Sequence, residues 1–103
     1  MNTKIKNLLT LAAKSGNIVS GDETCINYLK KNAIYLLIVA GDASENTKKK
    51  FNDKAFYRDT PIRFWQDKEE LGGTIGKGSR TVIGIIDKNF AEKLLSYFDE
   101  LSE

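Results

Sequence analysis

The chain has 103 residues, an apolar fraction of 41% and a charged fraction of 29%, which fit a single domain over residues 1–103 with one core. It contains no histidine and one cysteine, which excludes an internal disulfide, a histidine–cysteine metal site and the commonest general base. The net charge of +2 is unevenly distributed along the chain. Residues 87–103 contain five acids and two lysines, whereas residues 1–86 contain fourteen bases and nine acids. This basic body indicates either a polyanionic partner or an ordinary lysine-rich surface.

The chain carries no targeting signal that we recognise. Its N-terminus has neither the long apolar stretch nor the cleavage site of a signal peptide. The longest apolar run, residues 33–40, is too short to span a bilayer. We therefore expect a cytoplasmic protein without membrane contact, in which Cys25 is a small apolar helix residue.

The first element is an amphipathic helix that begins at Thr3 and ends near Gly16. Its apolar side chains have helical spacing and are Ile5, Leu8, Leu9 and Ala12. A short strand at residues 18–19 follows. Ser20 and Glu23 then have capping-box spacing, with the Ser20 hydroxyl accepting from the Glu23 amide. This pattern predicts a second helix from about Asp22 to Lys31, which buries Cys25, Ile26 and Leu29.

The middle of the chain predicts a central strand and a lysine-rich helix. Residues 34–40 have no polar alternation, which is typical of a strand that is covered on both faces. Residues 41–44 end this strand and start a helix that continues through Lys54. Such a helix contains three consecutive lysines, residues 48–50. A run of this kind is usually a solvated helix face, and contact with RNA is the less common alternative.

The last third predicts two strands and two helices. Residues 61–65 form a strand near an edge, with Ile62 and Phe64 facing inward and Arg63 and Trp65 outward. A capping box at residues 67–70 opens a short helix that stops at Gly72-Gly73. Residues 81–86 are another buried strand, and a C-terminal helix presents an apolar stripe made of Phe90, Leu94, Leu95, Phe98 and Leu101. The alternation predicts an α/β fold with helices on both faces of one parallel or mixed sheet.

No residue pattern indicates catalysis. Residues 73–79 superficially resemble a phosphate-binding P-loop, but that motif needs serine or threonine directly after its lysine and a helix next. Here Gly78 follows Lys77 and the next predicted element is a strand. Hydroxyl nucleophiles have no histidine base, and the acids lie mostly at helix starts. We therefore expect no enzyme, cofactor or metal.

Three loops are expected near one end of the sheet, at residues 16–24, 41–46 and 71–80. The first two precede helices, whose free backbone amides can bind phosphate. The third combines glycine backbone with Lys77 and Arg80. Such neighbouring loops can grip folded RNA, which proteins read largely by shape and by splayed bases.

The sequence resembles a known family over most of its length, from about Lys4 to Tyr97. The segments IVAGDAS (residues 38–44) and ELGGTIG (residues 70–76), followed by the strand at 81–86, resemble the ribosomal "L seven Ae" superfamily. The opening LLTLAAKSGNIVSG, residues 8–21, is similar to the bacterial YlxQ branch of that superfamily. The resemblance implies a three-layer α-β-α sandwich with a four-stranded mixed sheet. It also implies binding to kink-turn RNA, a sharply bent helix–internal loop–helix with sheared G·A pairs.

The resemblance places a first RNA-binding segment at the start of the second helix. Relatives carry Gly-x-Asn-Glu-x-x-Lys there, which enters the widened major groove. This chain keeps Gly21, followed by Asp22, but has Glu23, Thr24 and Asn27 where the family has Asn, Glu and Lys. Glu23 adds repulsion toward phosphate and the missing lysine removes a charge contact. Thr24 and Asn27 can still donate and accept hydrogen bonds.

A second RNA-binding segment is matched by residues 71–76, which in relatives pack against a looped-out nucleotide. Gly72, Ile75 and Gly76 fall there, with Ile75 as either an apolar contact surface or a plain core residue. Lys77 and Arg80 could pair with the RNA backbone. Asp42 corresponds to a family acid after the central strand, where helix capping competes with an RNA role.

Our main hypothesis is a monomeric protein that binds kink-turn or similarly bent RNA, with ribosomal RNA as one candidate. Its affinity would come from helix-start amides together with Lys30, Lys31, Lys77 and Arg80. The alternative is a protein-interaction module of the same fold that has lost RNA affinity, which the altered positions Glu23 and Asn27 motivate.

Overall fold

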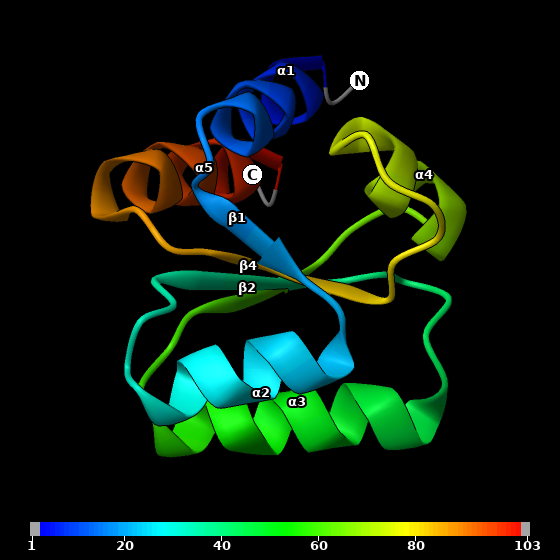
Figure 1. Ribbon diagram of the computed structural model, residues 1–103, viewed down its shortest axis with the longest axis vertical. Coiled ribbons are helices and arrows are strands. Elements are labelled where there is room, and N and C mark those ends of the chain that lie inside the picture. The colour runs from blue at the N-terminus through cyan, green and yellow to red at the C-terminus, as the bar shows by residue number, and fades with distance from the viewer. Residues whose placement is uncertain (1–2, 102–103) are drawn as a thin grey trace.

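The computed structural model, which describes residues 3–101, has five helices and a four-stranded sheet in strict alternation (Figure 1). Residues 1, 2, 102 and 103, at the two ends of the predicted domain, lie outside the described range. The elements are α1 (Thr3–Lys14), β1 (Ile18–Ser20), α2 (Asp22–Lys30), β2 (Leu36–Val39), α3 (Glu45–Tyr57), β3 (Ile62–Phe64), α4 (Lys68–Thr74), β4 (Val82–Ile85) and α5 (Lys88–Leu101). The predicted order of elements is confirmed. None of the helices within residues 3–101 is long and apolar enough to cross a membrane.

The sheet is mixed and has the strand order β1-β4-β2-β3. Strand β4 runs antiparallel to both β1 and β2, whereas β3 runs parallel to β2. Ile38 lies opposite Ile83 of β4 and Arg63 of β3. Every residue of β2 and β4 is buried, as the unbroken apolar run predicted for a strand between two helix layers.

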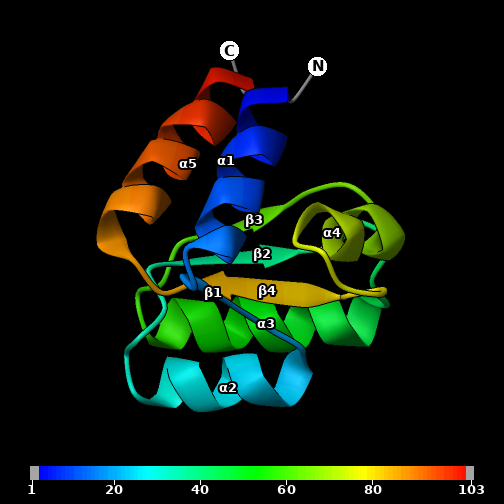
Figure 2. The same cartoon turned by 45° about the horizontal axis from the view of Figure 1, so that its top comes forward.

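Helices cover both faces of the sheet (Figures 1 and 2). Alternate residues of β2 pack against the helices on opposite faces of the sheet, because successive side chains of a strand point to opposite faces. Leu36 and Ile38 pack with α1, α4 and α5, whereas Leu37 and Val39 pack with α2 and α3. The predicted α-β-α sandwich is therefore confirmed.

One helix cap and one helix end differ from the prediction. The Ser20 hydroxyl does not cap α2, because Ser20 is the last residue of β1 and the N-cap position is Gly21, without a side-chain cap. Helix α4 does not stop at Gly72-Gly73 but continues to Thr74. The capping prediction for α4 is confirmed, since the Asp67 carboxylate accepts from the Glu70 amide at 2.8 Å.

The facing of the edge strand was predicted wrongly. Trp65 is 5% exposed and belongs to the core beside α1, α4 and α5, whereas Phe64 is 41% exposed. Successive side chains of the strand do alternate between its two faces. In a three-layer sandwich, however, helices lie against both faces, so alternation alone does not show which face is buried. Phe64 stays exposed because β3 lies at the edge of the sheet.

Cys25 lies in the core between α2 and the sheet, as predicted for a small apolar residue. Burial, and to a lesser extent the nearby Asp22 carboxylate, raises the pKa of its thiol to about 12 from the ordinary value of 9.0. The thiol is therefore protonated at neutral pH, which fits a packing role.

Candidate nucleic-acid interface

Three loops meet at the end of the sheet where β1 and β2 end and β4 begins. We call the surface formed by residues 20–24, 41–44 and 71–80 the loop edge; in Figure 1 it lies on the side of the sheet that carries α4. The Gly21 amide donates to the Val82 carbonyl at 3.0 Å, and the Ala40 amide donates to the Thr81 carbonyl at 2.8 Å. The predicted gathering of the three loops is confirmed for these residues. Gly16 and Asn17 of the first predicted loop lie instead at the opposite end of β1, where the Ile86 amide donates to the Asn17 carbonyl at 3.0 Å.

Gly21 gives the start of α2 its shape. Its φ of 98° and ψ of 151° lie in a region that is essentially restricted to glycine. The first amides of α2 have no helical partner and no N-cap side chain, so they point out of the helix end as donors. Glu23, Thr24 and Asn27 are exposed on the same helix. The Asp22 carboxylate lies 3.4 Å from the Lys50 ammonium of α3, which offsets one negative charge here.

Close backbone packing shapes residues 71–80. Gly72 is buried, and a Cβ on it would overlap the carbonyl of Gly78 and come within 3.0 Å of the Arg80 amide nitrogen. The Lys77 amide donates to the Gly72 carbonyl at 2.8 Å. The chain therefore folds back over α4 and leaves Gly76 and Lys77 exposed.

Arg80 connects this segment to the end of β1. Its Nε donates to the Ser20 hydroxyl at 3.1 Å, and its Nη1 donates to the Ser79 carbonyl at 2.9 Å. The Arg80 amide donates to the Lys68 carbonyl at 3.0 Å. A half-buried guanidinium with several acceptors holds its neighbours in fixed positions, so the start of α2 and residues 71–80 form one unit.

Asp42 performs a capping role, although not for its own helix. Its carboxylate accepts from the amide of Lys68, the first residue of α4, at 2.9 Å. Helix α3 is instead capped by Ser44, whose hydroxyl accepts from the Thr47 amide at 3.1 Å. Asp42 therefore attaches the loop after β2 to the start of α4.

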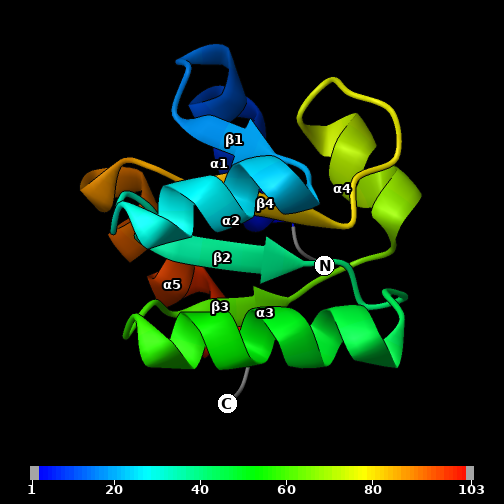
Figure 3. The same cartoon turned by 60° about the horizontal axis from the view of Figure 1, so that its bottom comes forward.

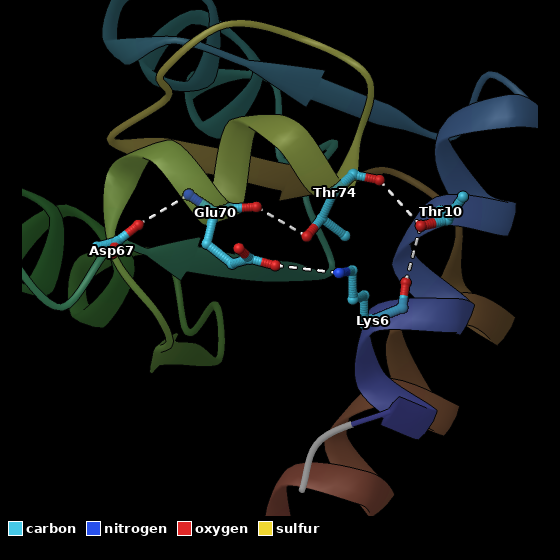
Figure 4. Close-up of polar contacts among 5 residues, drawn as sticks. All are labelled: Lys6, Thr10, Asp67, Glu70 and Thr74. Atoms are coloured by element: carbon cyan, nitrogen blue, oxygen red, sulfur yellow. Dashed lines mark hydrogen bonds and ion pairs between the residues drawn. The ribbon is translucent and has the colours of Figure 1, made fainter.

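Helix α4 is also attached to α1 through a short polar network (Figure 4). The Thr10 hydroxyl lies 2.9 Å from the Thr74 carbonyl, and the Thr74 hydroxyl donates to the Glu70 carbonyl at 2.8 Å. The Lys6 ammonium lies 3.2 Å from the Glu70 carboxylate. These contacts fix helix α4, at whose end the segment 75–80 begins.

The structure does not bring all the predicted site residues to the loop edge. Ile75 is 8% exposed and packs in the core, so the alternative of a plain core residue fits better than an apolar contact surface. Lys30 and Lys31 lie at the C-terminal end of α2, about 13 Å along the helix from Gly21. The remaining predicted residues lie at the loop edge or on the exposed face of α2, namely Gly21, Asp22, Glu23, Thr24, Asn27, Asp42, Gly72, Gly76, Lys77 and Arg80.

Two hydrogen bonds near the site were not expected from the sequence. The Ser20–Arg80 bond joins residues 60 positions apart, and the Thr10–Thr74 bond joins residues 64 positions apart. Neither pair has a local spacing that marks it. Within residues 3–101, no three histidine, cysteine, aspartate or glutamate side chains gather as a group that could hold a metal ion.

The chain is similar to named bacterial proteins over nearly its full length. It is 37% identical over 92 residues to "RNA-binding protein YlxQ" of Bacillus subtilis (strain 168), covering 89% of this chain and 92% of that protein. It is 40% identical over 90 residues to "RNA-binding protein YlxQ" of Enterococcus faecium, covering 87% of this chain and 86% of that protein.

A solved structure has the same fold. It is described as a protein with unknown function from Bacillus halodurans C and matches with a TM-score of 0.90 at 34% identity, covering 93% of this chain and 97% of that one. The model of the ribosomal protein L7Ae/L30e/S12e/Gadd45 family, to which the segments at residues 38–44 and 70–76 were likened as the "L seven Ae" superfamily, matches residues 3–96. The chain therefore belongs to the ribosomal protein L7Ae/L30e/S12e/Gadd45 family.

Proposed function

We propose that this chain is a non-catalytic RNA-binding protein that recognises kink-turn or similarly bent RNA through the loop edge. Its relatives in Bacillus subtilis and Enterococcus faecium are named RNA-binding proteins, and the family supplies the precedent for RNA. Ribosomal RNA is the first class of RNA to test, and the protein acts as a monomer without cofactor.

The observation that carries this proposal is the junction between the two segments that correspond to the family's RNA-binding elements. The Arg80–Ser20 bond, at 3.1 Å, joins residues 71–80 to the end of β1 directly before α2, and the Gly21–Val82 bond, at 3.0 Å, joins the start of α2 to the first residue of β4. A surface that reads RNA by shape must present its contacts at fixed positions. This junction supplies that rigidity before any RNA binds.

The contacts divide between phosphate and base edges. The unpartnered amides and positive dipole end of α2 attract a phosphate, and Lys77 adds a flexible cation beside them. The Thr24 hydroxyl and the Asn27 amide can exchange hydrogen bonds with base edges. Glu23 repels phosphate, so specificity depends more on shape and less on charge than in relatives that have asparagine at this position.

The direct test compares two RNA duplexes. One contains a kink-turn, and in the other the sheared G·A pairs are replaced by Watson–Crick pairs. We expect the protein to prefer the kink-turn at least tenfold, which corresponds to about 1.4 kcal/mol. Affinity should fall steeply between 50 and 200 mM salt, because phosphate contacts release counterions. Equal binding to both duplexes would contradict structure-specific recognition.

A pair of variants checks that the loop edge is the contact surface. Lys77→Gln removes an exposed cation at the loop edge, and Lys93→Gln removes an exposed cation from α5. We expect Lys77→Gln to reduce the affinity and the steepness of the salt dependence. The Lys93→Gln control should bind like the parent protein. Equal effects of the two substitutions would point to non-specific attraction.

The second candidate function is a protein-interaction module that no longer binds RNA. Glu23 and Asn27 favour it, because both are exposed and depart from the family pattern in the direction of weaker phosphate binding. The double variant Glu23→Asn with Asn27→Lys separates the two functions. Binding that appears only in this variant favours the interaction module, whereas little change favours RNA binding through the contacts described above.

A further inference from the structure

A second basic site lies at the opposite end of the α2–α3 layer. Figure 3 shows the two helices side by side, with their C-terminal ends away from α4. Between these ends is a groove of about 280 Å³ with an apolar floor of Ile26 and Leu29. Its walls include Lys30 of α2 together with Lys54, Tyr57 and Arg58 at the end of α3. We call it the cationic groove.

The charge of the cationic groove is strongly positive. Neither Lys30 nor Lys54 forms an ion pair with another residue in the described part of the chain. The acid in the groove, Asp53, is already paired with Lys49 at 3.0 Å. Cations at helix C-termini complement the helix dipoles, which accounts for part of this charge. It does not account for the aromatic residue beside it.

Tyr57 is 80% exposed on the rim of the cationic groove. The Arg58 guanidinium carbon lies over one face of the ring, 5.4 Å from its centre, and the ring's high exposure leaves the rest of it open to solvent. Because the ring is so exposed, it contributes little to the core. An open aromatic face with neighbouring cations matches the chemistry of single-stranded nucleic acid, in which bases stack and phosphates need positive charge.

We propose that the cationic groove binds a single-stranded RNA segment, with a base stacked on Tyr57 and phosphates near Lys30 and Lys54. The inference rests on the proposed function only in taking RNA as the ligand. Helix α2 is about 13 Å long, so a strand that leaves an RNA bound at the loop edge can follow the helix to the groove. Lys30 then contributes to RNA binding at this second site.

The test uses an oligouridylate of about ten nucleotides, a length within the usual range of single-strand sites, and a kink-turn duplex with and without the same tail. Tyr57→Ala removes the exposed ring. Phe56→Ala is the matched control, because Phe56 is 86% exposed on the same helix but does not line the groove. Lys30→Gln with Lys54→Gln tests the charge, and Lys93→Gln with Lys88→Gln controls for net charge.

We expect Tyr57→Ala to weaken oligouridylate binding about tenfold and to abolish the gain in affinity that the tail gives the kink-turn duplex. The untailed duplex should bind Tyr57→Ala as it binds the parent protein. Phe56→Ala should behave like the parent in every assay. If the kink-turn preference is absent but oligouridylate binding depends on Tyr57, the loop-edge proposal fails and the groove proposal stands.

The groove proposal is overturned by any of three results. The first is no measurable oligouridylate binding, and the second is an equal loss in Phe56→Ala and Tyr57→Ala. The third is displacement of the oligouridylate by polyglutamate together with normal binding by Tyr57→Ala, which would identify a cation cluster that takes any polyanion. Far-UV circular dichroism of each variant checks that the fold is kept, which we expect because both rings are exposed.

Discussion

The two ends of helix α2 are built differently. At the loop edge the backbone fixes the shape: Gly21 adopts a conformation reserved for glycine, Gly72 leaves room for the returning chain, and Arg80 joins the two. In the cationic groove, Lys30 and Tyr57 extend into solvent from helix ends. One end therefore has a fixed shape with few free charges, and the other has free charges and an open ring.

This difference decides what a substitution should do. At the loop edge, fold and binding depend on the same backbone positions, so a damaging change should reduce both stability and RNA affinity. In the cationic groove the side chains are exposed, and exposed positions usually change stability by less than about 0.5 kcal/mol. Substitutions in the cationic groove should therefore alter binding with little effect on the stability of the fold.

The largest expected effect follows from Gly72→Ala. The new Cβ would overlap the Gly78 carbonyl, which belongs to backbone and cannot move aside cheaply. We expect the free energy of unfolding to fall by about 3 kcal/mol, measured by urea denaturation, with loss of kink-turn binding. Gly73→Ala is the control, because a Cβ there meets nothing within 4 Å and alanine favours a helix. If both variants are equally stable, close packing at Gly72 does not shape the loop.

A smaller loss is expected from Gly21→Ala, which tests backbone conformation without crowding. A Cβ on Gly21 has open space, but its φ of 98° and ψ of 151° disfavour any side chain. We expect a loss of about 2 kcal/mol in the free energy of unfolding. Gly16→Ala, at φ 76° with equally open space, should lose about 1 kcal/mol. The reverse ranking in thermal or urea unfolding would contradict the backbone argument.

Most of the fold could be predicted from local patterns. The apolar run at residues 34–40 indicated a strand covered on both faces, and Asp67 with Glu70 indicated the start of α4, because each signal depends on neighbours in sequence. The prediction that Phe64 faces inward and Trp65 outward was wrong, because alternation separates the two faces of a strand but does not show which face is more buried. That depends on the edge position of β3, a property of the whole sheet.

The candidate site was less predictable for a related physical reason. Ser20 fits a capping box locally, yet its hydroxyl accepts from Arg80 in the folded chain. Asp42 could cap the helix that follows it, but it caps α4 instead. A polar side chain can form hydrogen bonds of similar energy with several partners, and the tertiary structure determines which partner lies within reach. Lys30 was grouped with Lys77 and Arg80 as a source of RNA affinity, because sequence alone does not place the two ends of α2 relative to the other loops.

A third prediction concerns pH and the core between α2 and the sheet. The Cys25 thiol has a pKa of about 12 in the folded protein and an ordinary value of 9.0. A raised pKa means that above pH 9 the unfolded chain loses this proton first, so stability should fall as pH rises from about 9 toward 12. Between pH 9 and pH 10 we expect the parent protein to lose about 1 kcal/mol more than Cys25→Ala.

The measurement is urea unfolding under reducing conditions at several pH values. The comparison uses the change with pH in each protein, because Cys25→Ala also lowers stability at every pH by removing a buried sulfur. Lysine and tyrosine titration is common to both proteins and cancels. Parallel profiles for the two proteins would contradict a strongly raised thiol pKa.

The smallest expected effect concerns the ion pair between Asp22, at the start of α2, and Lys50 of α3. Asp22 and Lys50 are 3.4 Å apart and each side chain is roughly half exposed, so solvent weakens their attraction. We expect Lys50→Gln to change the free energy of unfolding by less than about 0.5 kcal/mol. Asp22→Asn should lose slightly more, because it also removes an anion from the positive end of the α2 dipole.

The two variants should rank in the opposite order for RNA affinity, with the larger loss in Lys50→Gln. Lys50→Gln leaves the Asp22 charge unpaired beside the amides that would meet a phosphate, so kink-turn binding should weaken a few-fold, whereas Asp22→Asn should bind at least as well as the parent. The double variant shows whether the two residues act as a pair. If Lys50→Gln instead loses more than 1 kcal/mol of stability and leaves binding unchanged, the loop edge depends on side-chain attraction, and the contrast between the two ends of α2 is wrong.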